Sequence, residues 1–272
     1  MEQNYKQRVI EFFNSRTAYD AEGDSHPQEA QRLLDYVPLT SGQSVLDIAT
    51  GTGLLVIPAA KAISPNGKAI GVDISPIMLV QAQEKITKQA ITNLELIEAD
   101  IESIDFTPEQ FDVIFCCSAI VYVTDIPALL AKCYQWLKPQ GYFAFTTPDR
   151  NSYLANLKIR LSRELFDIDL PHIIRPLWTP EKCYSLLKQS GFHNIEIEKH
   201  QYNRFKITEN TGLARIENDF YPQGNPLQSL SEAELQLLQT EFEKAVNRLI
   251  AEQGVWQEAN NLYVKARKSS IV

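Results

Sequence analysis

The stretch "VLDIATGTGLL", residues 45–55, decides how the rest of the chain is interpreted. An apolar run ends at Asp47, and Gly51 and Gly53 follow before apolar spacing resumes at Leu54. This is the pattern of a buried strand that turns into a helix, and glycines at such a turn let backbone approach a neighbour or a ligand closely. The stretch therefore predicts a binding turn whose ligand could be a phosphate or a nucleoside.

Short apolar runs alternate with helical periodicity on the carboxyl side of this turn. The runs are apolar on both faces, as expected for strands covered by helices on both sides of a parallel sheet. Strands are predicted at 44–49, 68–73, 94–99, 111–117, 141–147, 193–200 and 255–267. Helices are predicted at 3–15, 27–37, 54–63, 76–90, 126–137, 179–190 and 231–252. The alternation predicts a doubly wound, mostly parallel seven-stranded α/β sheet of Rossmann-like type.

The chain divides into four parts of one predicted domain. Two amphipathic helices precede the first strand, and a stretch bounded by prolines interrupts the alternation after Thr147. The parts are an N-terminal helical cap (1–40), a cofactor-binding core (41–148), a lid or substrate insertion (149–177), and the remaining sheet and helices (178–272). In this arrangement the insertion is expected to form the pocket for a second substrate.

Composition limits the classes of partner and compartment. The formal net charge is −8 and no lysine or arginine cluster stands out, which argues against nucleic acid because phosphate binding needs concentrated cationic charge. No run of 18 apolar residues is present, so no membrane span is expected. The four cysteines have no C-x-x-C spacing and are expected to be buried free thiols in a reducing, cytoplasmic setting.

Acidic residues at the ends of successive strands narrow the choice of ligand. A dinucleotide fingerprint requires a third glycine where Val56 stands, so that fingerprint fails. Asp73 ends the second predicted strand and can accept both hydroxyls of a ribose, and Asp100 follows the third strand, where it can accept an adenine amino proton. Together with Asp47 at the end of the first strand, these acids would repel pyrophosphate, so the pattern favours a positively charged nucleoside.

With these motifs the sequence resembles a known family. The segments "VLDIATGTG", "AIGVDIS", "IEADIES", "FDVIFCCSAIVYVTD" and "LKPQGYFAF" are similar, in this order, to the motifs of class I S-adenosylmethionine-dependent methyltransferases. The resemblance covers residues 40–150 and is strongest to the ubiquinone/menaquinone methyltransferase-like branch that acts on small molecules. It implies S-adenosyl-L-methionine as cofactor and S-adenosyl-L-homocysteine as product.

The resemblance also implies roles for individual residues. Asp47 would orient the methionyl amino group, Asp73 would hold the ribose, and Asp100 with the Ile101 amide would read the adenine edge. Ile74 and Met78 would sandwich the adenine, and backbone near Cys117 and Ser118 would meet the methionyl amino group. The turn itself contributes Ala49, Thr50, Gly51 and Gly53. Thr50 stands where the family usually has glycine or cysteine, a departure that the site is expected to tolerate.

No residue stands out as the general base of the reaction. Methyl transfer from a sulfonium is an in-line displacement that depends mainly on alignment, and a base helps when the acceptor is a hydroxyl or an acidic carbon. The candidates are Tyr19, His26, Tyr122 and His172, each of which could equally be a structural or surface residue. No metal site is expected.

The leading hypothesis is therefore methyl transfer to an O, N or C atom of a small, apolar or aromatic metabolite. The alternative is a cofactor-binding module without transferase activity that serves a regulatory or interaction role. A nicotinamide-dependent oxidoreductase is disfavoured by Val56 and by the acidic residues. The sequence alone does not name the acceptor, the methylated atom, the pathway or the oligomeric state.

Overall fold

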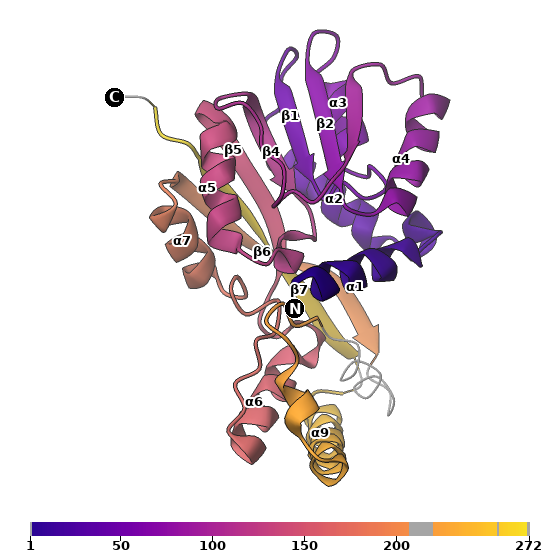
Figure 1. The fold of residues 1–272 in the computed structure, drawn as a ribbon, viewed down its shortest axis with the longest axis vertical. Helices are drawn as coiled ribbons and strands as arrows, with labels where there is room; N and C mark the ends of the chain where they lie inside the picture. Colours follow the sequence, from indigo (N-terminus) through magenta and orange to yellow (C-terminus); the bar gives the residue numbers. More distant parts are fainter. Residues whose placement is uncertain (1, 207–219, 255, 271–272) are drawn as a thin grey trace.

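A seven-stranded sheet forms the centre of the molecule (Figure 1). The structure is a computed structural model that describes residues 2–206, 220–254 and 256–270. The strand order is β3-β2-β1-β4-β5-β7-β6, in which β7 runs antiparallel to both β5 and β6 and the other pairings are parallel. The order reverses between β1 and β4, and in sheets of this kind ligands bind outside the carboxyl ends of the strands at such a switch point. The predicted doubly wound sheet is confirmed.

The strands lie where the sequence predicts them, with two of them longer than expected. They are β1 (Ser44–Ile48), β2 (Lys68–Asp73), β3 (Leu94–Glu98), β4 (Phe111–Cys116), β5 (Leu137–Pro148), β6 (His193–Lys206) and β7 (Trp256–Arg267). Strand β5 begins directly after a helix, and β6 continues past the predicted end at residue 200 because β7 pairs with it along most of its length. Pairing with a neighbouring strand, which no local pattern records, sets these two bounds.

Helices cover both faces of the sheet. The α-helices are α1 (Glu2–Asn14), α2 (Ser25–Asp35), α3 (Val56–Ala62), α4 (Pro76–Lys88), α5 (Ile126–Trp136), α6 (Ala155–Phe166), α7 (Pro180–Gln189) and α9 (Glu232–Gln253). Short 3-10 helices are η1 (Tyr19–Ala21), η2 (Ile120–Tyr122), η3 (Ser152–Leu154) and η4 (Pro226–Ser229). Side chains of α2, α3 and α4 pack on one face, and those of α5 and α7 on the other. The central strands are therefore shielded from water on both sides, whereas the edge strands β3 and β6 keep exposed side chains.

Helix starts follow the capping chemistry visible in the sequence. The Ser75 hydroxyl accepts a hydrogen bond from the Met78 amide at the start of α4, and Thr179 caps α7 in the same way. Ser231 and Glu234 form the expected capping box at the start of α9. These caps fix the first turn of each helix independently of the rest of the fold.

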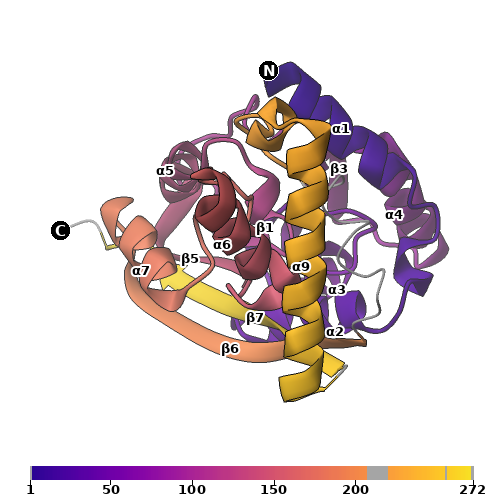
Figure 2. The same ribbon diagram turned by 90° about the horizontal axis from the view of Figure 1, so that it is seen from below.

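Helices α6 and α9 form a lobe beyond the carboxyl ends of the strands (Figure 1), and α1 crosses between this lobe and the sheet. Figure 2, which views the molecule from below, shows α6 and α9 side by side in front of the sheet. Ile159 and Leu161 of α6 share a buried apolar cluster with Leu238, Phe242 and Val246 of α9. The predicted insertion thus contains a helix, and α9, which the sequence analysis assigned to the C-terminal part, packs with it. The lobe and α1 together cover the carboxyl ends of the parallel strands.

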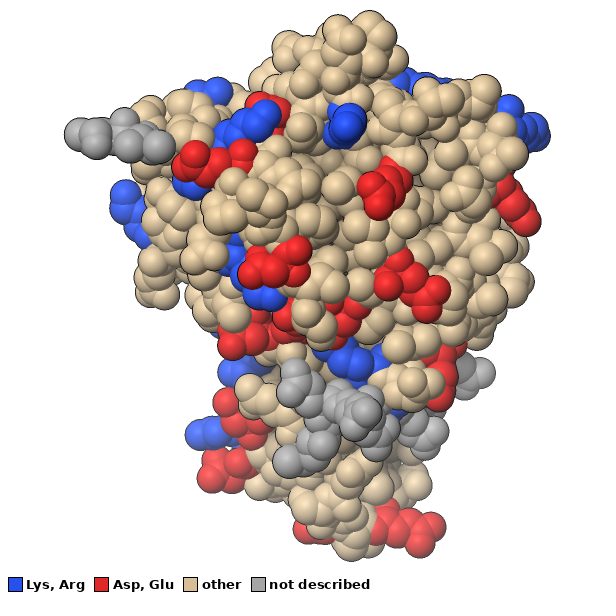
Figure 3. All heavy atoms as spheres, turned by 45° about the horizontal axis from the view of Figure 1, so that its top comes forward, with Lys and Arg blue, Asp and Glu red and all other residues tan. Residues whose placement is uncertain are grey.

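Surface charge is mixed. On the face shown in Figure 3, lysine and arginine side chains are scattered among acidic ones and form no continuous cationic surface. Among the described residues, no helix is both long and apolar enough to cross a membrane.

Candidate active site

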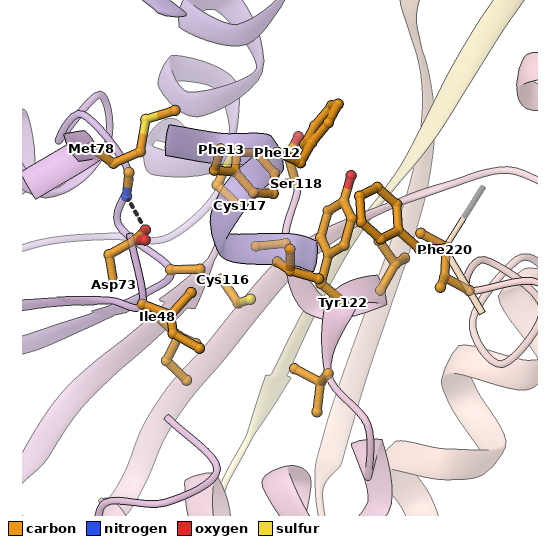
Figure 4. Close-up of a pocket in the computed structure, with 18 of the residues that line it drawn as sticks. Phe12, Phe13, Ile48, Asp73, Met78, Cys116, Cys117, Ser118, Tyr122 and Phe220 are labelled. Atoms are coloured by element: carbon orange, nitrogen blue, oxygen red, sulfur yellow. Dashed lines mark hydrogen bonds between the residues drawn. The ribbon is translucent and has the colours of Figure 1, made fainter. Parts of the chain in front are cut away.

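A cavity of about 520 Å³ lies between the carboxyl ends of the strands and the helices that cover them. The residues that follow β1, β2, β3 and β4 form its inner wall, while α1, α2, α6 and α9 contribute the outer wall. In Figure 4, Asp73 and Met78 lie on one side of the cavity, Tyr122 and Phe220 lie on the other, and Cys117 lies between them. The volume falls within the usual range for a pocket that encloses a small ligand.

The glycine turn presents backbone to this cavity. Gly51 has a φ of 57° and Gly53 a φ of 80°, in the left-handed region that favours glycine. A Cβ atom at Gly51 would meet nothing within 4 Å, although the residue lines the cavity, so the missing side chain leaves open space for a ligand. A Cβ atom at Gly53 would come within 2.8 Å of Ile57, which shows that this glycine permits close packing of the turn on α3. Ala49 also has a positive φ, of 53°.

Asp47 and Asp73 are both buried beside this turn. The Thr50 hydroxyl donates to Asp47 Oδ2 at 2.6 Å, while Asp47 Oδ1 is buried with no partner among the described residues. Burial raises the pKa of Asp47 to about 7. Asp73 accepts hydrogen bonds from the backbone amides of Gly51 at 2.7 Å and Ser75 at 2.8 Å, and its side chain remains part of the cavity wall. The two carboxyl groups give this side of the cavity a wall of hydrogen-bond acceptors, which suits a cationic or donor-rich ligand.

Asp100 forms the far end of the same wall. It lines the cavity together with Ile101, and the Lys6 ammonium of α1 lies 3.2 Å from Asp100 Oδ1. Lys6 also forms an ion pair with Glu102. Helix α1 is thereby fastened over the end of β3. Ile74 and buried Met78 line the neighbouring part of the cavity.

Cys117 and Ser118 line the middle of the cavity, at the end of β4. The backbone of Ser118 has a φ of 57°, and its amide donates to the Thr146 hydroxyl at 2.8 Å. The Ser118 hydroxyl donates to Glu29 of α2, which also accepts a 2.6 Å hydrogen bond from Asn261 of β7. The end of β4, helix α2 and strand β7, which are distant in the sequence, are therefore joined by hydrogen bonds at this part of the cavity wall.

Tyr19 and His26 form a stacked pair on the cavity wall. The Tyr19 hydroxyl lies 3.1 Å from His26 Nδ1, and the ring centroids are 4.5 Å apart. Arg16 lies over the Tyr19 ring, and its Nη2 is 3.4 Å from His26 Nε2. Burial, followed by the charge of Arg16, lowers the pKa of His26 to about 4, so the imidazole is neutral at neutral pH.

Tyr122 and His172 lie on the apolar side. The Tyr122 ring packs edge-on against Phe13 and Phe220, each with a centroid distance of 5.3 Å, and burial raises the pKa of its hydroxyl. His172 lines the cavity, and its Nδ1 accepts a hydrogen bond of 3.4 Å from the Ile174 amide. The structure therefore brings the predicted site residues, including the four candidate bases, to the wall of one cavity, with the exception of Gly53, whose Cβ position packs against Ile57 of α3.

Several wall residues were missed by the sequence analysis. They are Lys6, Phe12, Phe13, Arg16, Glu29, Lys158, Phe220, Phe242 and Asn261. Glu29 left a signal, because it lies four positions before Leu33 on the apolar face of its helix, where a carboxyl is unexpected. The others come from segments whose approach to the cavity depends on tertiary packing. Within the described part of the chain, no cluster of side chains has the composition of a metal site.

A comparison with family models matches residues 39–200, more than half of the chain, to the family described as "Methyltransferase domain". The chain belongs to the class I S-adenosylmethionine-dependent methyltransferases. The matched region runs from just before β1 into β6 and so contains the glycine turn and every strand-end acid of the cavity.

Among curated relatives, this methyltransferase is 31% identical over 147 residues to aklanonic acid methyltransferase DauC of Streptomyces sp. strain C5, an alignment that covers 53% of this chain and 67% of that protein. It is 35% identical over 140 residues to the ubiquinone/menaquinone biosynthesis C-methyltransferase UbiE of Marinomonas, covering 49% and 56% of the two chains. The chain thus spans between about half and two thirds of these relatives.

Solved structures share the fold. A phosphoethanolamine N-methyltransferase of Haemonchus contortus in complex with S-adenosylhomocysteine has a TM-score of 0.56 at 24% identity, over 89% of this chain and 52% of that one. The YcgJ protein of Bacillus subtilis has a TM-score of 0.61 at 15% identity, over 90% and 100%.

The cavity fits the cofactor of this family, S-adenosylmethionine. The open space beside Gly51 admits a ligand against backbone, and the unpartnered Asp47 Oδ1 offers a buried acceptor to a donor-rich or cationic group. A wall of three acids suits a ligand that carries positive charge and hydroxyl donors and carries no phosphate.

Proposed function

We propose that this methyltransferase transfers a methyl group from S-adenosylmethionine to a small apolar or aromatic molecule. The observation that carries the proposal is the division of one cavity into an acidic half at Asp47, Asp73 and Asp100 and an apolar half at Tyr122 and Phe220. The donor fits the first half, and a planar acceptor fits the second. When bound, the donor supplies an electrophilic methyl group on a positively charged sulfur.

The acidic half would hold the donor through short-range contacts. Asp73 would accept from the ribose hydroxyls, and Asp100 with the Ile101 amide would read the adenine edge, with Ile74 and Met78 on its faces. Asp47, through its unpartnered Oδ1, would accept from the methionyl amino group, directly or through water. The remaining proposed contacts are backbone contacts from Ala49, Thr50, Gly51, Cys117 and Ser118, which all line the cavity.

The apolar half would orient the acceptor. Rings from α1 and η2 and Phe220 pack edge-on around one another, and Phe242 of α9 adds to the wall from the lobe. Such rings exclude water and hold a planar molecule, so that acceptor and methyl group can align for in-line transfer. The relatives' names include C- and O-methyltransferases, which supports a small-molecule acceptor and leaves the methylated atom open.

The four candidate bases differ in basicity. Burial raises the pKa of the Tyr19 and Tyr122 hydroxyls, so both phenols stay protonated and act as hydrogen-bond donors or as packing surfaces. The low pKa of His26 makes it a weak proton acceptor. A proton-accepting role for any of these residues, or for His172, stays a prediction.

Transfer of a labelled methyl group from S-adenosylmethionine to a panel of apolar phenols, quinols and carboxylic acids tests the proposal. Labelled product from at least one acceptor class is expected. Tight binding of S-adenosylmethionine without product from any class would favour the alternative, a binding module without transferase activity. Replacing residues 149–177 with those of a relative should change acceptor preference, and an unchanged preference would count against the acceptor pocket proposed here.

We further propose a cytoplasmic location and no nucleic-acid partner. The four cysteines are all free thiols, as expected in a reducing compartment. The mixed charge of the face in Figure 3 and the net charge of −8 support a small molecule over a polyanion.

A further inference from the structure

Glu29 is a buried carboxyl in the middle of the cavity wall. Glu29 is 1% exposed, and it reaches the cavity from α2, between Ser118, which follows β4, and Asn261 in the middle of β7. The Ser118 hydroxyl donates to Oε2, and the Asn261 amide donates to Oε1 at 2.6 Å. Hydrogen bonds from these residues and Thr146 oppose the rise in pKa that burial causes, but burial prevails.

All of these partners are neutral. Within the described residues, no lysine, arginine or histidine forms an ion pair with Glu29. An ionised carboxylate buried without a counter-ion costs several kcal/mol, so such a group either takes up a proton or receives a cation from elsewhere. The cavity that Glu29 faces is the place from which a cation would come.

The topology places Glu29 on the side of the cavity opposite the acids that end β2 and follow β3. Asp73 and Asp100, at the ends of β2 and β3, define the nucleoside end, on one side of the switch point between β1 and β4. Ser118 and Asn261, which hold Glu29, follow β4 and lie in β7 on the other side. A donor bound across the switch point would therefore place its methionyl end, which carries the sulfur, on the side of Glu29.

Asn261 supplies a second, independent sign of a ligand here. It is 3% exposed and lines the same cavity, and its Oδ1 is a buried acceptor with no partner in the described part of the chain. Buried acceptors are normally satisfied, so this atom indicates a place for an N–H or O–H donor of a bound molecule. That donor would lie beside the Glu29 carboxyl, because the same amide side chain contacts both.

We propose that Glu29 is the proton acceptor of methyl transfer, acting on a hydroxyl of an acceptor whose second N–H or O–H group donates to Asn261 Oδ1; this rests on the function proposed above. The acceptor oxygen forms a bond to the methyl carbon as the carbon–sulfur bond breaks, and that bond's electron pair stays on sulfur. The hydroxyl proton passes to the Glu29 carboxylate. Before transfer the positive sulfonium of the donor is paired with the negative Glu29 carboxylate. After transfer both the thioether and the Glu29 carboxylic acid are neutral, so no net charge from these two groups accumulates in the buried cavity.

Other titratable groups surround Glu29. Cys117 at the end of β4, Tyr263 of β7 and Tyr19 of η1 all have pKa values raised above their usual range, so they stay neutral near pH 7. Asp47 of β1, with a pKa of about 7, also titrates near neutral pH. The Glu29→Gln variant retains Asp47, so any pH dependence that it loses belongs to the Glu29 carboxyl and any that it keeps can belong to Asp47.

The deciding experiment compares the binding of S-adenosylmethionine with that of S-adenosylhomocysteine, which lacks the positive charge on sulfur. Isothermal calorimetry is performed from pH 5 to 9 on the wild type, on Glu29→Gln, and on Asp35→Asn, a matched acid-to-amide change on the exposed side of the same helix. At high pH, Glu29→Gln should weaken S-adenosylmethionine binding at least fivefold and leave S-adenosylhomocysteine binding within twofold. Asp35→Asn should change neither.

In the wild type, the ratio of the Kd of S-adenosylhomocysteine to the Kd of S-adenosylmethionine should rise with pH. Glu29→Gln should remove most of that rise. Equal effects on the two ligands, or no effect on either, would overturn the proposal. The titrations with S-adenosylmethionine and S-adenosylhomocysteine need no methyl acceptor. A failure of the proposed function would therefore appear separately, as donor binding without methylated product in the acceptor panel. With an acceptor from the panel, Glu29→Gln should also lower kcat by 10²–10⁴-fold.

If Glu29→Gln does not fold, Ser118→Ala tests the same carboxylate. Loss of the hydroxyl donor should move the midpoint of the pH-dependent preference to higher pH, because the ionised form loses a hydrogen bond. An unchanged midpoint would contradict the assignment to Glu29.

Discussion

The open space beside Gly51 gives a direct test of the donor site. In Gly51→Ala the new Cβ atom would have no protein neighbour within 4 Å, so the substitution adds no clash to the free protein. The left-handed backbone at a φ of 57° disfavours alanine by about 1–2 kcal/mol, and reduced freedom of the unfolded chain offsets about 0.4–1 kcal/mol of this. The free energy of unfolding should therefore fall by about 1 kcal/mol.

Donor affinity should respond more strongly than stability. Because Gly51 lines the cavity, the methyl group would occupy space that the donor needs against the turn. We expect the Kd of S-adenosylhomocysteine to rise at least tenfold, which corresponds to about 1.4 kcal/mol. Calorimetry measures the Kd, and urea unfolding measures the stability.

Gly42→Ala provides the matched control. Gly42 also has a positive φ, of 89°, and open space around its Cβ position, but it does not line the cavity. It should lose comparable stability and keep its affinity for S-adenosylhomocysteine. The reasoning is refuted if Gly51→Ala binds S-adenosylhomocysteine as tightly as Gly42→Ala does.

Three further predictions concern single side chains. Asp73→Asn should weaken S-adenosylmethionine binding by about 1–3 kcal/mol through loss of charge-assisted hydrogen bonds, and calorimetry giving an unchanged Kd would mean that the ribose is held elsewhere. The pKa of His26 lies below its unfolded value, so the unfolded chain binds more protons between about pH 4 and 6.5 and stability falls as pH drops through this window. Urea unfolding should show a smaller loss over that window in His26→Gln, and an identical loss would contradict the assignment. Lys6→Met removes the ion pairs to Asp100 and Glu102, and stopped-flow dissociation of S-adenosylhomocysteine should become several-fold faster, whereas an unchanged rate would show that α1 does not restrain the ligand.

The sequence by itself determined the sheet and the donor half of the site. Strand and helix periods, the glycine turn and the acids after β2 and β3 are all properties of contiguous residues. Since parallel strands end at one edge of a sheet, a local pattern repeated along the chain was enough to place Asp47, Asp73 and Asp100 together.

Only the tertiary structure decided what covers this edge. Glu29 and Asn261 are separated by 232 positions, and Lys6 and Asp100 by 94, yet each pair is in contact. Helix α9 packs on α6 through apolar side chains that would suit any buried face. Hydrophobic burial is non-directional, so the sequence shows that a helix has a face to bury without naming its partner. The acceptor half of the cavity is built from contacts between segments that are distant in the sequence. For this reason only the folded chain shows that Glu29 lies beside the acceptor half.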